Sequence, residues 1–168
     1  MTYIDKSELF QEISNKLTSK GFKIESEDQN RPWGGFFVIN EDQAQEFADA
    51  YFEGLNVQEL KISGKLSPKV LIVGPNKRLS WQYHHRRAEI WRVIRGEVGV
   101  VTSPTDEEHE LKILKEGESI RLSQGERHRL VGLGSYGVVA EIWQHTDAAN
   151  PSDEDDIVRV QDDFGRGI

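Results

Sequence analysis

The chain has 168 residues and contains no cysteine, one methionine and five prolines. The absence of cysteine excludes disulfide bonds, thiolate zinc sites, iron–sulfur clusters and cysteine nucleophiles, but it leaves histidine, carboxylate and glutamine as metal ligands. Long apolar runs are also absent, and a run such as Val70–Val73 is far too short to span a bilayer. Met1–Asp5 lacks the pattern of a signal peptide, so we expect a cytoplasmic protein that does not enter a membrane.

The chain also has few basic residues, with 21 Lys and Arg against 29 Asp and Glu and a formal charge of −8. That balance argues against binding to nucleic acid or anionic membranes, which requires a basic face. The charge is unevenly spread: the segment 77–96 has six basic residues and one acidic residue, whereas 147–163 has seven acidic residues and one basic residue. The basic segment 77–96 is compatible with binding of a small anionic ligand, and also with solvated arginines at a strand edge.

Two segments near the N-terminus have the apolar spacing of helices. Residues 7–19 repeat apolar side chains at helical intervals, with Ser7 as a cap, and 41–53 do the same after Asn40. Between them, Phe36–Ile39 indicates a strand. We therefore divide one predicted domain, 1–168, into an N-terminal helical extension with one strand over 1–54 and the remainder over 55–168.

After residue 54 the pattern changes to short apolar runs separated by turn residues. Many strands without intervening helices indicate a β-sandwich or barrel, so the fold class is mainly β with two N-terminal α-helices. The acidic tail around Asp153–Asp156 is expected to form a surface loop. The expected strands are 58–63, 69–73, 79–84, 89–95, 97–102, 110–114, 118–123, 127–132 and 137–144.

Four polar residues in these strands form a candidate metal site. Gln82 and His84 are two residues apart and would share one face of a strand, and Glu89 begins the next strand. His128 lies at a later strand in the sequence. Such a mixed nitrogen and oxygen set suits Zn, Fe, Mn, Co or Ni. From spacing alone, His84 could instead be a buried histidine bonded by its neighbours, and Glu89 the partner of a nearby arginine.

The spacing of these residues resembles the two sequence motifs of the cupins. Gln82-x-His84-x4-Glu89-x6-Gly96 is similar to the first motif, with Gln in place of the usual first His. The second motif is similar to the segment Gly117–His128, in which Ser123 replaces the usual Pro. Two further departures are Asn76 in place of the opening Gly of the first motif and Gly132 in place of the closing Asn of the second.

The resemblance is closer to the cupin domain of the type II mannose-6-phosphate isomerases. The segment Leu79–Trp91, LSWQYHHRRAEIW, is similar to their signature, and the likeness extends to RPWG at Arg31–Gly34 and EDDIVRVQDDFGR at Glu154–Arg166. The resemblance implies a double-stranded β-helix, or jelly-roll barrel. It also implies one divalent metal, with Zn²⁺ first and Mn, Fe, Co or Ni as alternatives. Bifunctional members carry a nucleotidyltransferase domain, for which this sequence has no room. The implied metal ligands are Gln82, His84, Glu89 and His128.

The function implied by this resemblance is an aldose–ketose isomerase that acts on a sugar phosphate, with mannose 6-phosphate and fructose 6-phosphate as the expected pair. Glu89 and Glu141 are the candidate groups for moving the proton. Glu141 could instead be a strand-end charge paired with an arginine. Two other classes remain open: a cupin that binds a sugar or sugar phosphate without turnover, and a metal-dependent oxygenase.

A sugar phosphate also needs cationic partners, and arginine suits bidentate binding of an oxyanion. The available basic residues are Lys69, Arg78, Arg86, Arg87, Arg127, Arg129 and either Arg159 or Arg166. No pattern places the other histidines, His85, His109 and His145, in a site, so they are expected at the surface. Jelly-roll edges are compatible with a homodimer, for which no residue pattern is decisive. The substrate-binding residues that we predict are Arg31, Lys69, Arg87 and Arg166.

Overall fold

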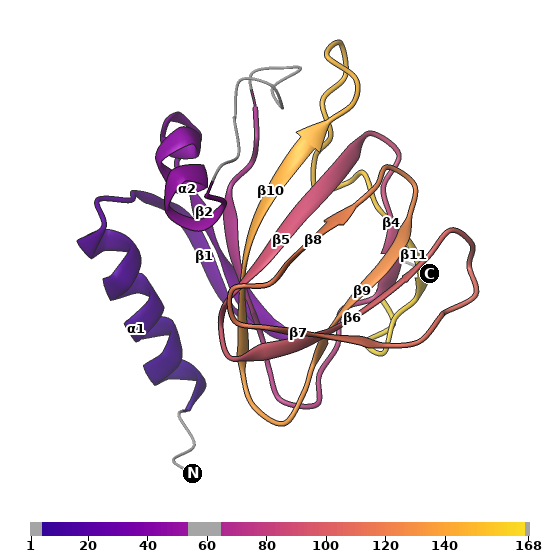
Figure 1. Ribbon diagram of the computed structural model, residues 1–168, viewed down its shortest axis with the longest axis horizontal. Helices are drawn as coiled ribbons and strands as arrows, with labels where there is room; N and C mark the ends of the chain where they lie inside the picture. The colour runs from indigo at the N-terminus through magenta and orange to yellow at the C-terminus, as the bar shows by residue number, and fades with distance from the viewer. Residues whose placement is uncertain (1–4, 54–64, 167–168) are drawn as a thin grey trace.

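The computed structural model describes residues 5–53 and 65–166, and in them strands outnumber helices (Figure 1). This confirms the prediction of a mainly β protein with two N-terminal α-helices, α1 and α2. The elements are α1 (Lys6–Ser19), β1 (Ile24–Arg31), β2 (Gly34–Ile39), a 3-10 turn (Glu41–Gln43), α2 (Ala44–Tyr51), β3 (Lys69–Val73), β4 (Trp81–Tyr83), β5 (Arg87–Arg95), β6 (Glu97–Ser103), β7 (Lys112–Lys115), β8 (Ser119–Leu122), β9 (Arg127–Gly132), β10 (Gly137–His145) and β11 (Val158–Gln161).

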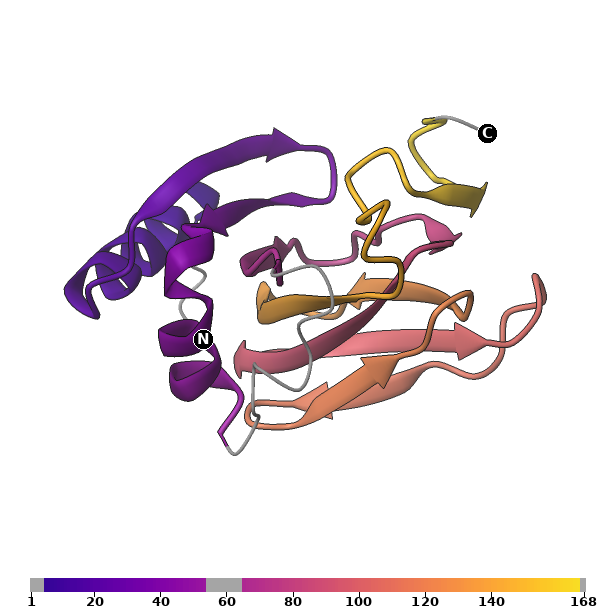
Figure 2. The same cartoon turned by 90° about the horizontal axis from the view of Figure 1, so that it is seen from above.

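The strands form two antiparallel sheets. One has the order β1-β2-β3-β10-β5-β8 and the other the order β11-β4-β9-β6-β7. Neighbours such as β3 and β10 are distant in the sequence, so long-range pairing holds the sheets together alongside pairs of consecutive strands such as β1 and β2. Seen from above, the helices lie at one end of the molecule and the C-terminal strand lies at the other (Figure 2). The predicted jelly-roll barrel is confirmed by this arrangement.

Strand β10 separates two apolar clusters through its alternation. Val138, Ala140 and Ile142 belong to a cluster with Phe10 of α1 and with residues of α2, outside the larger sheet. Val139 points the other way, into the cluster between the two sheets. Because successive strand side chains face opposite sides, one strand can support the helices and line the barrel at once.

The strand β1 was not predicted, because almost every side chain in it is polar. Six of its eight residues are exposed, and only Ile24 and Asp28 are half-buried. Its backbone is nevertheless paired with β2, with Ile24 opposite Ile39. A strand that buries little apolar area has no clear period of two, and so its sequence does not distinguish it from a loop.

Gly34, the last residue of the RPWG segment, lets β2 approach β3 closely. Its φ is +148°, and a Cβ atom built there would lie 1.9 Å from the carbonyl oxygen of Ile72. Any other residue would therefore collide with the neighbouring strand. Asn76 has a φ of +58°, which agrees with its place in a motif that usually has glycine.

The other differences from prediction concern element boundaries. The expected helix over 41–53 begins as the 3-10 turn, where Asn40 Oδ1 accepts a hydrogen bond from the Asp42 N–H at 2.9 Å, and its α-helical part ends at Tyr51. The expected strand 58–63 lies outside the described residues. Neither helix in the described part of the chain is long and apolar enough to cross a membrane.

Candidate metal centre

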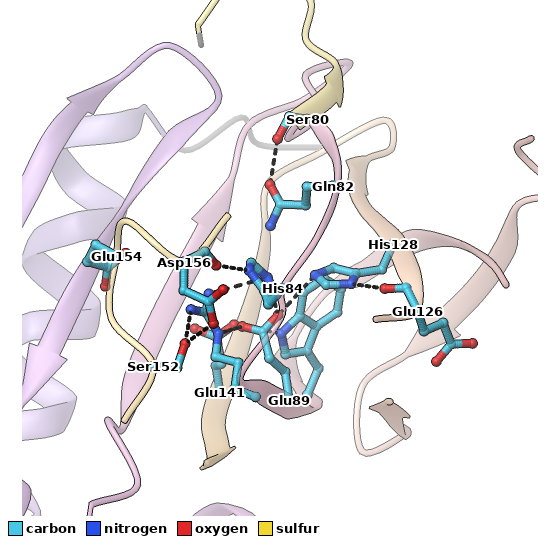
Figure 3. A network of polar contacts seen from close by, with 12 residues as sticks. Ser80, Gln82, His84, Glu89, Glu126, His128, Glu141, Ser152, Glu154 and Asp156 are labelled. Carbon is cyan, nitrogen blue, oxygen red and sulfur yellow. Dashed lines mark hydrogen bonds and ion pairs between the residues drawn. The ribbon is translucent and has the colours of Figure 1, made fainter. Parts of the chain in front are cut away.

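Three buried ligand residues meet at one end of the barrel (Figure 3). His84 follows β4, Glu89 lies on β5 and His128 lies on β9. One donor atom from each lies within 4.8 Å of the other two, and none of the three residues is more than 3% exposed. This group could bind a metal ion.

The orientation of both imidazoles is set by backbone carbonyls. His84 Nδ1 lies 2.7 Å from the carbonyl oxygen of Asp156, and His128 Nδ1 lies 3.1 Å from that of Glu126. A carbonyl oxygen only accepts, so each Nδ1 carries the hydrogen and the neutral ring keeps its lone pair on Nε2. Both Nε2 atoms therefore present lone pairs, at 3.3 and 3.0 Å from Glu89 Oε1.

Two of these three inward-facing atoms lack a hydrogen-bond donor. Glu89 Oε1 and His128 Nε2 are buried and have no hydrogen-bond partner in the described part of the chain, whereas His84 Nε2 lies 3.3 Å from Arg87 Nη2. Buried acceptors without a donor are costly, and a cation placed between them would satisfy them. Two imidazole nitrogens and a carboxylate oxygen fit a divalent transition metal, which the residues present could therefore hold.

The charges around the centre favour the protonation states that metal binding requires. Burial would raise the pKa of Glu89, but nearby groups, with the positive charge of Arg87 first among them, lower it well below its usual value. Arg87 Nε lies 3.4 Å from Glu89 Oε2. Burial also lowers the pKa of His84, despite the nearby carboxylate. Glu89 is thus an anion and His84 a neutral ligand.

Gln82, the fourth predicted ligand, lies beside this group but faces a different partner. It is paired with His128 across β4 and β9. Its Oε1 accepts a hydrogen bond from Ser80 Oγ at 2.5 Å, so the oxygen is turned toward Ser80 and the amide nitrogen toward the centre (Figure 3). Ligation would require a rotation of the amide that exchanges the two atoms. Its role as a ligand stays a prediction.

The acidic tail is part of the site, and the prediction of a simple surface loop is wrong for Asp156. Its side chain is only 3% exposed and accepts hydrogen bonds from the N–H groups of His85 and Arg86, at 2.9 and 3.0 Å, and from Ser152 Oγ at 2.6 Å. Burial would raise the pKa of Asp156, but these bonds lower it. Because its carbonyl also orients His84, the tail supports the metal centre directly.

Glu141 lies next to the centre on β10 and is 4% exposed. Trp91 Nε1 donates to its Oε1 at 2.8 Å, so Glu141 is bonded to a tryptophan rather than paired with an arginine. Burial and the neighbouring Glu89 raise the pKa of Glu141 well above its usual value. The pKa values of these two adjacent carboxyl groups are thus shifted in opposite directions, lowered for Glu89 and raised for Glu141.

All of the predicted substrate-binding residues lie around one cavity of about 120 Å³ beside the centre. Trp33, Trp91, Trp143 and Phe36 contribute aromatic walls. Although the whole chain carries a charge of −8, the cavity has more basic than acidic side chains, which suits an anionic ligand. The basic residues are Arg31, Lys69, Arg87, Arg159 and Arg166, and the acidic ones are Glu89, Glu141 and Glu154.

One of the remaining histidines differs from expectation. His85 and His109 are exposed as predicted, but His145 is fully buried at the end of β10. Its Nδ1 accepts a hydrogen bond from the Ser152 N–H at 2.9 Å. Burial and then nearby positive charge, including that of Arg87, lower the pKa of His145 to about 4. The alternation of β10 would have placed the side chain of His145 on the inner face, but the predicted strand, 137–144, ended one residue before it.

The jelly roll and its buried histidine and carboxylate group define the chain as a cupin with a candidate metal centre. Residues 45–162 match the family described as Mannose-6-phosphate isomerase C-terminal. The match covers most of the chain, and the protein belongs to this family. The resemblance predicted from the sequence motifs is therefore confirmed.

The relatives in sequence are longer proteins. The chain is 29% identical over 151 residues to a mannose-1-phosphate guanylyltransferase of Salmonella montevideo, a match that covers 90% of this chain and 26% of the relative. It is 31% identical to the xanthan biosynthesis protein XanB of Xanthomonas campestris, over 81% of this chain and 23% of the relative. The alginate biosynthesis protein AlgA of Pseudomonas aeruginosa is 29% identical over 93% of this chain and 27% of its own length. The chain thus spans about a quarter of these relatives.

Solved structures resemble the fold at low sequence identity. The capsular polysaccharide assembling protein CapF of Staphylococcus aureus superposes with a TM-score of 0.52 at 15% identity, over 83% of this chain and 34% of CapF. Vicilin from tomato has the same TM-score at 14% identity, over 79% of this chain and 32% of its own. At such identities the likeness concerns the fold alone.

Proposed function

We propose that the protein is a metal-dependent aldose–ketose isomerase that interconverts mannose 6-phosphate and fructose 6-phosphate or a related pair. The observation that carries this proposal is the buried group His84, Glu89 and His128, which directs two imidazole lone pairs and a carboxylate to one point beside a basic cavity. Membership of the family described as Mannose-6-phosphate isomerase C-terminal supports the reaction class.

His84, Glu89 and His128 would hold the ion, with Gln82 as a fourth ligand after rotation of its amide. Zn²⁺ is the first choice because two imidazoles and one carboxylate are a common set for catalytic zinc, and Mn, Fe, Co and Ni accept the same atoms. A divalent ion supplies a Lewis acid that polarises the carbonyl and the neighbouring hydroxyl oxygen of the open-chain sugar. Arg87 and the backbone carbonyls of Asp156 and Glu126 keep the ligands oriented.

The reaction moves one proton from carbon C2 to carbon C1, and another from the O2 hydroxyl to O1. Both candidate carboxyl groups lie at the centre, but they differ in availability. The pKa of Glu89 lies well below its usual value, with the charge of Arg87 as the first lowering cause, which makes Glu89 a weak base. Glu141 has a raised pKa, so its ionised form is the stronger base, and the charge of Lys69, directly opposite it on β3, offsets that shift only in part. We therefore assign the proton transfer to Glu141, and ligation to Glu89.

The test compares two histidine variants in the purified protein loaded with Zn²⁺, Mn²⁺ or Co²⁺. His128→Ala removes a buried ligand, and we expect it to lose bound metal and at least 10³-fold in turnover of mannose 6-phosphate. His109→Ala changes an exposed histidine away from the centre and is the matched control, with metal content and turnover unchanged.

Wild-type protein that binds metal but interconverts no ketose and aldose phosphate would contradict the isomerase. Tight binding of the sugar phosphate without turnover would then indicate a binding cupin. Oxygen consumption with Fe²⁺ would indicate an oxygenase, whereas full turnover with redox-inactive Zn²⁺ argues for the isomerase.

A further inference from the structure

The C-terminal strand adds one more arginine to the cavity. β11 pairs with β4 so that Arg159 lies directly opposite Gln82. Directly opposed residues of an antiparallel pair project from the same face of the sheet, and both of these side chains line the cavity. The tail therefore places Arg159 on the same wall as a predicted metal ligand.

Arg159 differs from its two basic neighbours in its hydrogen bonding. Arg31 Nε lies 3.2 Å from Asp28 Oδ2, and Arg166 forms a bidentate pair with Asp162 at 2.8 and 3.0 Å. The buried Nε of Arg159, by contrast, has no partner within the described ranges. A guanidinium N–H withdrawn from water without an acceptor is costly, so this position calls for an added acceptor.

The charges around Arg159 favour an anion as that acceptor. The pKa of Arg159 is lowered, first by burial and then by the positive charges of Arg166 and Arg31, and Asp162 offsets them only in part. The positive charges of these three guanidinium groups thus repel one another, and Asp162 compensates them only in part. A phosphate dianion would relieve the repulsion and accept hydrogen bonds in the fork geometry that arginine prefers.

The basic residues at the metal end already have partners. Arg87 Nη1 donates to Ser152 Oγ and to the carbonyl of Asp153, both at 2.9 Å. Lys69 Nζ forms an ion pair with Glu154. These contacts tie the tail to β3 and β5 and leave the two side chains less available to a ligand.

From these contacts we propose that Arg159, flanked by Arg31 and Arg166, is the subsite for the phosphate group of the sugar phosphate, while Arg87 and Lys69 position the tail. The identity of the sugar phosphate rests on the proposed function. The sugar carbons then extend from Arg159 past the aromatic walls toward Glu89 and Gln82, because all of these line one cavity.

Calorimetric titration of the metal-loaded protein with mannose 6-phosphate and with mannose tests the subsite. Arg159→Gln is expected to weaken mannose 6-phosphate binding by roughly 10- to 100-fold, the range for loss of a hydrogen bond to a charged group, and to leave mannose binding unchanged. Arg159→Lys keeps the charge but not the fork, and is expected to weaken binding by less.

Arg78→Gln is the matched control. Arg78 Nε lies 2.6 Å from Oδ2 of Asp163, which belongs to the same C-terminal segment as Arg159, but Arg78 does not line the cavity. The Arg78→Gln variant therefore tests whether loosening of the tail alone weakens binding. It should leave the affinity for mannose 6-phosphate unchanged. Because Arg159→Gln removes a partly compensated buried charge, the melting temperature of this variant should equal or exceed that of the wild type. If Arg159 were a structural residue instead, the melting temperature would fall.

The proposal is overturned if Arg159→Gln weakens both ligands equally or neither, or if Arg78→Gln weakens mannose 6-phosphate as strongly. It is also overturned if the wild type binds mannose 6-phosphate no more tightly than mannose. If Arg159→Gln selectively loses affinity for mannose 6-phosphate and the wild type shows no turnover, the isomerase is contradicted and the phosphate subsite is still supported.

Discussion

The two faces of β10 are buried to the same degree but carry different chemistry. On the outer face, Ala140 and Ile142 are fully buried against other apolar side chains. On the inner face, Glu141, Trp143 and His145 are no more than 4% exposed, yet they lie beside polar and charged groups. The outer face is stabilised by burial of apolar area, whereas the inner face holds groups whose burial costs free energy unless a partner satisfies them.

This difference separates stability from function within one strand. Removing atoms from the outer face should lower the free energy of unfolding and leave the chemistry of the cavity intact. Neutral replacements on the inner face should preserve or raise the free energy of unfolding and impair the chemistry of the cavity. The reason is that functional sites retain groups whose burial is unfavourable in the absence of a ligand.

The largest effect on stability is expected from Phe37→Ala. Phe37 is fully buried in the outer cluster, with its ring centroid 5.3 Å from that of Phe10. Loss of the ring should lower the free energy of unfolding by about 3–5 kcal/mol, through lost burial and a residual cavity. Guanidinium unfolding monitored by circular dichroism measures it. A loss below about 1 kcal/mol would show that the outer face does not carry the stability assigned to it.

Glu141→Gln should have a small effect on stability and a large one on turnover. Glutamine keeps the shape and can still accept from Trp91. A carboxyl with a raised folded pKa contributes stability at low pH that is lost as the pH rises through that value, so the variant should equal or exceed the wild type at pH 8, within about 1 kcal/mol. Turnover of mannose 6-phosphate should fall by roughly 10²–10⁴-fold. Destabilisation comparable to that of Phe37→Ala would make Glu141 a structural residue.

The smallest effect is a change in the pH dependence of stability in His145→Asn. The folded pKa of His145 is about 4, below the value of 6.5 expected when unfolded, so the unfolded chain binds the proton more readily. The stability due to the neutral ring is present above pH 6.5 and is lost as the pH falls toward 4. Asparagine can accept the Ser152 N–H without titrating, so the variant should show a shallower decline in melting temperature between pH 6.5 and 5.

Ile142→Val provides the control from the outer face. It should cost about 0.5–1.5 kcal/mol at every pH and give a curve parallel to that of the wild type, because it changes no titratable group. A wild-type profile that already shows no decline between pH 6.5 and 5 would rule out the role given to His145.

The sequence predicted the strands that bury one or both faces and also the largely exposed β7, but it missed β1 and β11. β3 and β10 are rich in Val, Leu and Ile, and both lie close to their expected bounds. β1 has an almost wholly polar sequence and pairs with β2 at the edge of its sheet, so periodicity could not reveal it. β11 is equally hard to detect, since it is a short, half-buried strand in an acidic tail.

For the site, the spacing of His84 and Glu89 and the later His128 were enough to propose a metal centre, since the ligand types and intervals are visible in the chain. The tail was harder to interpret. Asp156 looks like one of several solvated carboxylates in the sequence. Only the structure shows that its side chain is buried against the backbone of His85 and Arg86 and that its carbonyl oxygen bonds His84, a candidate ligand.

The sequence by itself determined which residues could bind a metal, that no thiolate could be among them, and that the protein is a cupin, because composition and motif spacing are local properties of the chain. Only the tertiary structure decided which carboxyl group has a lowered pKa and which a raised one, and that the buried Nε of Arg159, which lines the cavity, has no partner in the described residues. Those properties depend on burial and on charges brought together by long-range strand pairing, as when β11 places Arg159 opposite Gln82.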